Sequence, residues 1–122
     1  MRDFRKLMVW ERGYRLTLAV YEVTVGFPSA ELYGLTSQIR RASAAIPANI
    51  AEGCGRGSNA DLGRFLQMAL GSASELESHL LLARGLGLVE SEDYKRLTRE
   101  VTEIKRMLTA FVKNLKAFAN KT

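Results

Sequence analysis

Apolar residues recur every three or four positions through most of the chain, which is the spacing of one face of an α-helix. Short stretches rich in glycine, proline and serine interrupt this pattern. The pattern predicts helices from Phe4 to Val25, from Ser29 to Ala51 or Glu52, from Ser58 to Arg84, and from Ser91 nearly to the C-terminus. The alternation among β-branched residues that marks strands is essentially absent. Because the connections are short, we expect an all-α fold, an antiparallel up-down four-helix bundle.

The predicted helices differ in how much apolar surface they carry. The fourth helix has one apolar face, formed by Tyr94, Leu97, Val101, Ile104, Leu108, Phe111, Leu115 and Phe118. The first helix has two apolar stripes. One consists of Leu7, Trp10, Tyr14, Leu18, Tyr21 and Val25, and the other of Val9, Leu16, Val20 and Val23. The third helix is also apolar around much of its circumference, with Met68 and Leu82 away from its main apolar side.

The extra apolar stripes predict self-association. A small bundle buries one stripe per helix, so a second stripe indicates a surface that another molecule covers. A broad stripe on a deeply buried helix is the alternative interpretation. The sequence therefore favours a homo-oligomer built from the bundle.

Two segments are unusual inside helices. Pro47 lacks the amide hydrogen that a helix needs, so we expect the second helix to kink or break there. Residues 71–74, Gly-Ser-Ala-Ser, lower the helix propensity of the third helix. A run of such small residues favours the close approach of another backbone. Both features are interpreted first as packing features.

Length and composition place the chain among soluble globular proteins. Its 122 residues suit one domain spanning residues 1–122, and 47% of them are hydrophobic and 25% charged. The longest apolar run, Leu80 to Ala83, is far too short to cross a membrane. The first residues are charged and lack the apolar core of a secretion signal. The single cysteine, Cys54, fits a reducing compartment, so we expect a cytoplasmic protein without membrane association.

Metal-dependent catalysis is disfavoured by the residues available for it. Glu75 and His79 lie four positions apart on one helix face, and Glu31 and Glu52 could approach from another helix. Di-metal sites in four-helix bundles use a Glu-x-x-His motif on each of two helices. This chain has one histidine, and its spacing from Glu75 differs from that motif. We therefore expect no metal and no cofactor.

Two further candidates for chemistry have simpler structural interpretations. Cys54 would need an activating base, and nothing in the sequence brings His79, the only histidine, to it. The spacing Gly53-x-Gly55-x-Gly57 resembles a phosphate-binding loop, but it follows a helix and lacks the Gly-Lys-Ser/Thr ending. These glycines are typical of a helix C-cap and turn. We expect no catalytic residues and no enzymatic activity.

Basic residues on the fourth helix give the clearest functional hypothesis. The formal net charge is +5 and the isoelectric point is about 9.7. Lys95, Arg99, Arg106 and Lys113 fall within about a quarter-turn of one another, opposite the apolar face, and Lys105 and Lys116 flank them. This strip is interpreted either as a solvated face or as a surface that contacts the phosphate backbone of RNA or DNA. It carries no aromatic residue and no base-reading motif.

Several motifs along the chain resemble those of one protein family. The first is Phe4-x-x-Leu7-x-Val9-Trp10. The next spans the second helix, as Phe27-Pro28-x-x-Glu31-x-x-Gly34-Leu35-Thr36-x-Gln38-x-x-Arg41 and Ile46-Pro47-x-Asn49-Ile50-Ala51-Glu52-Gly53. The last is Phe65-Leu66-x-x-Ala69-x-Gly71-Ser72-x-x-Glu75-Leu76. Together they resemble the four-helix-bundle proteins encoded in intervening sequences of bacterial 23S ribosomal RNA genes.

The resemblance implies a four-helix protomer that assembles into a homopentameric ring. It also implies a fold related to the accessory proteins of diversity-generating retroelements, which form basic barrels that bind nucleic acid and a reverse transcriptase. The family has no established enzyme activity. The resemblance implies neither a ribosomal subunit nor a reverse transcriptase partner for this chain.

The polar residues of these motifs lie on helices otherwise rich in apolar contacts. Our hypothesis is that some of Arg41, Asn49, Glu52 and Glu75 form a buried hydrogen-bonded network across the second and third helices, or a subunit boundary.

The leading functional hypothesis is a non-enzymatic homo-oligomer that binds nucleic acid through basic helix faces. The alternative is an oligomeric scaffold, or protein-interaction module, without a nucleic-acid ligand.

Overall fold

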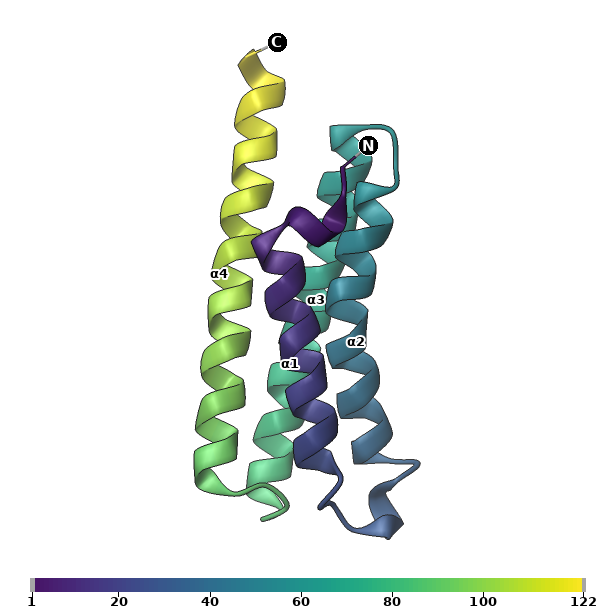
Figure 1. The fold of residues 1–122 in the computed structure, drawn as a ribbon. Coiled ribbons are helices and arrows are strands. Elements are labelled where there is room, and N and C mark those ends of the chain that lie inside the picture. The colour runs from purple at the N-terminus through teal and green to yellow at the C-terminus, as the bar shows by residue number, and fades with distance from the viewer. Residues whose placement is uncertain (1, 122) are drawn as a thin grey trace.

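The computed structural model describes the backbone of residues 2–121 and the side chains of residues 2–117. This part of the chain contains four long helices and no strand. They are α1 (Met8–Thr24), α2 (Leu35–Cys54), α3 (Asn59–Gly85) and α4 (Ser91–Lys121). Successive helices run antiparallel, each packs against the next, and α4 returns to pack against α1 (Figure 1). The predicted all-helical fold is confirmed.

The boundaries of the first two helices differ from the prediction. Residues 4–6 and 29–31 form short 3₁₀ turns, so α1 begins at Met8 and α2 begins at Leu35 rather than at Ser29. Gly34 separates the second turn from α2 with φ −114° and ψ −112°, which is not a helical conformation. The carboxylate of Glu31 accepts a hydrogen bond of 3.3 Å from the backbone N–H of Leu35. Glu31 therefore satisfies a free amide at the start of α2 instead of lying within it.

The end of α2 and the start of α3 agree more closely with the sequence pattern. The Ser58 side chain accepts a hydrogen bond of 3.1 Å from the backbone N–H of Asp61, as a helix N-cap does. The α2 helix ends at Cys54, two or three residues later than predicted. The buried Gly53 remains helical because it faces α3, where a Cβ atom would lie 2.9 Å from Cβ of Phe65. This glycine serves close packing rather than helix termination.

The core contains the apolar residues that face the bundle axis. On α4 the buried residues include Leu97, Val101, Ile104, Leu108 and Leu115, as predicted, while Tyr94 and Phe111 are half-buried. The side chain of Phe118, the last residue of the predicted face, lies outside the described residues. On α1 the buried residues include Val9, Leu16 and Val20. The other stripe of α1, which includes Tyr14, Leu18 and Tyr21, thus lies largely outside the core.

Pro47 does not break α2, which is continuous from Leu35 to Cys54. The proline removes the amide that would bond the carbonyl of Ser43 four residues earlier. The hydroxyl of Thr17 on α1 lies 3.0 Å from that carbonyl oxygen and 2.8 Å from the carbonyl oxygen of Gly13. A Cβ atom at Gly13 would lie 3.2 Å from Ile46 and 3.4 Å from the Pro47 ring. The close approach of α1 therefore places a hydroxyl donor, shared with the carbonyl of Gly13, beside the carbonyl that lacks its helical amide.

The small residues in the middle of α3 point in different directions. Ala69 and Ala73 are fully buried. Gly71 is exposed, and a Cβ atom added there would meet nothing within 4 Å. Within one chain, the predicted close approach of another backbone does not occur at Gly71.

Candidate functional site

Three of the six predicted basic residues lie on the outer face of α4 without an acidic partner. Lys95, Arg99 and Lys113 are exposed, and no carboxylate lies within ion-pair distance of them among the described side chains. Lys95 and Lys113 are eighteen residues apart, which corresponds to about 27 Å along the helix axis. These three cations are therefore separated along α4 and available to an anionic partner. We call them the α4 cation row.

The other predicted basic residues have additional contacts. Arg106 is also exposed, but its guanidinium donates two hydrogen bonds to the carboxylate of Glu103, one of them 3.1 Å long from Nε. These bonds lower the pKa of the Glu103 carboxyl and raise the pKa of Arg106, so both groups stay charged at neutral pH. Lys105 is half-buried and contacts Glu77 of α3 at 3.0 Å. Lys116 lines a groove between α3 and α4.

The predicted polar network is only partly assembled within one chain. Arg41 on α2 contacts Glu75 on α3 at 3.4 Å, and Nε2 of His79 lies 3.3 Å from the same carboxylate oxygen. The side chains of Arg41 and Glu75 are 65% and 41% exposed, so this link lies at the surface. Asn49 donates to the carbonyl of Ala45 on its own helix.

The fourth member of that predicted network, Glu52, forms an ion pair at 3.1 Å with Arg56, two residues past the end of α2. A buried network across α2 and α3 is therefore not present within one chain. The subunit-boundary form of the hypothesis stays a prediction.

The remaining candidates for chemistry have structural contacts of their own. In the part of the chain that the structure describes, no group of three or more His, Cys, Asp or Glu residues could hold a metal ion. Cys54 is buried, and burial raises the pKa of its thiol, which disfavours the nucleophilic thiolate.

No helix among the described residues is long and apolar enough to cross a membrane.

An exposed apolar stripe runs along α1. Its residues are Tyr14, Leu18, Tyr21 and Val25, with Leu18 53% and Val25 76% exposed. The Tyr14 ring stacks on Trp10 with centroids 5.2 Å apart. The guanidinium carbon of Arg40 on α2 lies 4.6 Å from the centroid of the Tyr21 ring. Both rings thus pack against neighbouring side chains at the surface. We call these four residues the α1 stripe.

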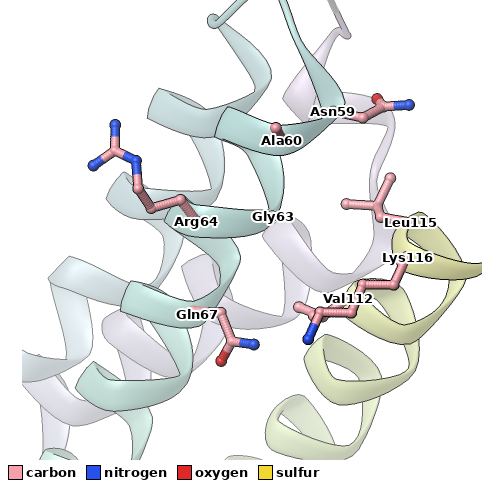
Figure 2. Close-up of a pocket in the computed structure, with 8 residues that line it drawn as sticks. All are labelled: Asn59, Ala60, Gly63, Arg64, Gln67, Val112, Leu115 and Lys116. Carbon is pink, nitrogen blue, oxygen red and sulfur yellow. The ribbon is translucent and has the colours of Figure 1, made fainter. Parts of the chain in front are cut away.

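One feature was missed at the level of the sequence. A groove of about 460 Å³ lies between the first turns of α3 and the later part of α4, as Figure 2 shows. Its walls come from residues 59–67 and 112–116, which are about fifty positions apart. The spacing of residues within each helix gave no signal of it, because the groove depends on how the two helices pack.

Comparisons with known proteins agree with this fold. A family model described as 23S rRNA-intervening sequence protein matches residues 5–110. A similar solved structure is that of a protein of unknown function from the S23 ribosomal protein family of Bacteroides thetaiotaomicron. It is 27% identical, with a TM-score of 0.79, and the match covers 87% of this chain and 99% of that chain. No curated protein matches the chain.

Proposed function

The chain belongs to the family of 23S rRNA-intervening sequence proteins, and we propose that it functions by binding: copies of the bundle associate, and the assembly holds nucleic acid along α4. In this proposal the protein is not an enzyme and acts in the cytoplasm. The resemblance of its motifs to the family favours a pentameric ring. The family itself has no characterised function, so the proposal rests on surface chemistry.

The α4 cation row is the observation that carries the proposal. Lys95, Arg99 and Lys113 lie along one helix with no carboxylate partner among the described side chains, whereas Lys105 and Arg106 have partners. A row of separated cations suits a polymer that carries one charge per phosphate. Phosphate contacts of this kind carry no base information, so the binding we propose is independent of sequence. In a closed ring the row would be repeated on every subunit and its field strengthened.

A salt titration of nucleic-acid binding tests this function. We expect fluorescence anisotropy to show binding of labelled single-stranded RNA and duplex DNA at low salt. The logarithm of the binding constant should fall linearly with the logarithm of salt concentration, with a slope of about −0.9 per phosphate contact on duplex DNA. Absence of binding at 50 mM salt by the intact assembly would contradict the proposal.

The α1 stripe favours a second candidate function that needs no nucleic acid. Exposed Tyr14, Leu18, Tyr21 and Val25 recur every three or four positions along α1 and its C-cap, and exposed apolar surfaces are typical of protein interfaces. On this reading the assembly is a scaffold or an interaction module, and its surface cations keep it soluble. Assembly without any binding of RNA or DNA would favour this second function.

Self-association through the α1 stripe has its own test. We expect Leu18→Glu to reduce the mass measured by sedimentation from that of an oligomer to that of the 13.6-kDa chain. A buried, unpaired carboxylate in an apolar interface is unfavourable enough to separate the subunits. Leu32→Glu is the matched control, because Leu32 is similarly exposed, at 44%, but lies outside α1. An unchanged mass for Leu18→Glu would exclude the α1 stripe as an interface, and a monomeric wild-type protein would contradict self-association.

A further inference from the structure

The groove between α3 and α4 has the size of a site for a small molecule. Its volume of about 460 Å³ lies within the range of ligand-binding pockets. It forms because Ala60 and Gly63 contribute little or no side chain to the α3 wall. A Cβ atom added at Gly63 would lie 4.0 Å from Leu115 on α4, an ordinary contact distance. The open volume is therefore a result of small residues at these positions.

The lining of the groove combines an apolar floor with polar side chains at its edges, which include Asn59, Gln67 and Lys116. Val112 and Leu115 form the α4 side of the floor. Figure 2 shows Lys116 on α4 and Gln67 on α3 reaching toward one another across the groove, whereas Arg64 points away from it. The lining includes no carboxylate, and Lys116 has no acidic partner within ion-pair distance among the described side chains. An ammonium group and an amide thus face an apolar surface, and no acid neutralises the cation.

We propose that this groove binds a small amphipathic carboxylate, an aliphatic chain that ends in an acid group. The chain packs on Gly63, Val112 and Leu115. The carboxylate accepts hydrogen bonds from the ammonium of Lys116 and the amide nitrogen of Gln67, and charge-assisted bonds of this kind are about twice as strong as neutral ones. The site adds a ligand to the protein that is separate from the polyanion bound by the α4 cation row.

The length of the groove selects a small ligand over a protein helix. The α3 wall runs from Asn59 to Gln67, which corresponds to about 12 Å, or roughly two helical turns. A docked amphipathic helix uses anchors at positions i, i+3, i+4 and i+7, which span about 10.5 Å along its axis. Among the side chains that the structure describes, the α4 wall consists of residues 112–116, about 6 Å along the helix axis. A single chain of methylene groups fits this shorter surface.

Calorimetric titration of the intact protein with decanoate tests the site, with decanol as the uncharged probe. We expect decanoate to bind at least tenfold more tightly than decanol. Lys116→Met keeps the apolar stem of the side chain but removes its charge, so it should weaken decanoate binding about tenfold and leave decanol binding unchanged. Gly63→Leu should abolish the binding of both probes, because its side chain occupies the groove.

The matched control is Gly71→Leu, since Gly71 lies on the same helix but faces open space. It should bind decanoate as the wild type does. Equal binding of decanoate and decanol, or an unchanged affinity in Gly63→Leu, would overturn the proposal, as would no binding of decanoate at all. A smaller sedimentation mass for Gly63→Leu would also overturn it, because a second copy of the chain would then occupy the groove. The assay contains no nucleic acid, so its outcome is independent of the proposed nucleic-acid function.

Discussion

Replacing Gly53 with valine is expected to lower the free energy of unfolding by about 3 kcal/mol. A Cβ atom at this position would lie 2.9 Å from Cβ of Phe65 and 3.0 Å from a methyl carbon of Leu62. Cβ of Phe65 is tied directly to the backbone of α3 and cannot rotate away, so α2 and α3 would have to separate where they pack. Urea unfolding followed by circular dichroism at fixed protein concentration measures the change.

Gly71→Val is the matched control for this prediction. Gly71 also lies inside a helix, but nothing lies within 4 Å of a Cβ atom there. Valine has a slightly higher helix propensity than glycine, so the stability of this variant should stay within about 0.5 kcal/mol of the wild type. Equal stabilities of the two variants would show that α2 and α3 do not approach as closely at Gly53 as the structure indicates.

The triple variant Lys95→Gln, Arg99→Gln, Lys113→Gln is expected to weaken the binding of duplex DNA on the order of a hundredfold at 0.1 M salt. Each cation that neutralises a phosphate releases counterions, and three such contacts contribute together. The slope of the salt titration should become shallower by about three, if each residue makes one phosphate contact. Anisotropy titrations of both proteins at four or five salt concentrations measure the affinity and the slope together.

The matched control changes the same net charge on another surface. Arg41→Gln, Arg56→Gln, Arg64→Gln removes three cations from α2, α3 and the loop between them, each of which already has an acidic partner. We expect only a few-fold loss of affinity for duplex DNA, because this variant weakens the electrostatic field of the whole protein but leaves the α4 cation row intact. Equal losses in the two triple variants would mean that binding follows net charge alone. Full affinity of the α4 variant would exclude the row as the binding surface.

Much of the fold follows from local patterns in the sequence. The buried residues Leu97, Val101, Ile104 and Leu108 lie three or four positions apart, and this spacing alone places them on one face of α4. The cap at Ser58 was also predictable, because a serine side chain bonds an amide only three residues away. Such features depend on neighbours in the sequence and on the geometry of one helix.

The features that were mispredicted depend on contacts between elements. The start of α2 is set by the non-helical backbone of Gly34 and by the carboxylate of Glu31, which accepts a hydrogen bond from the amide of Leu35. At Pro47, where the helix does not break, the carbonyl of Ser43 lies 3.0 Å from a hydroxyl donor of α1. No reading of the second helix alone could include that donor.

In the candidate site, too, some features follow from one helix alone and others depend on how two helices pack. The exposure of Lys95, Arg99 and Lys113 follows from their position opposite the apolar face of α4. The pairing of Lys105 with Glu77 could not be predicted from α4 alone, because it depends on how α3 and α4 pack beside each other. The contact between Arg106 and Glu103, by contrast, is a spacing of three that a helix makes favourable, so it could have been inferred.

The contact between Thr17 and the Ser43 carbonyl has a consequence for the order of evolutionary change. While Pro47 is present, loss of the Thr17 hydroxyl removes the side-chain donor beside the Ser43 carbonyl, at a cost of about 1–3 kcal/mol. Once Pro47 is replaced by alanine, the restored amide serves that carbonyl within α2, and residue 17 becomes free to vary. A lineage that drifts by single neutral steps can therefore lose the threonine after the proline, but not before it.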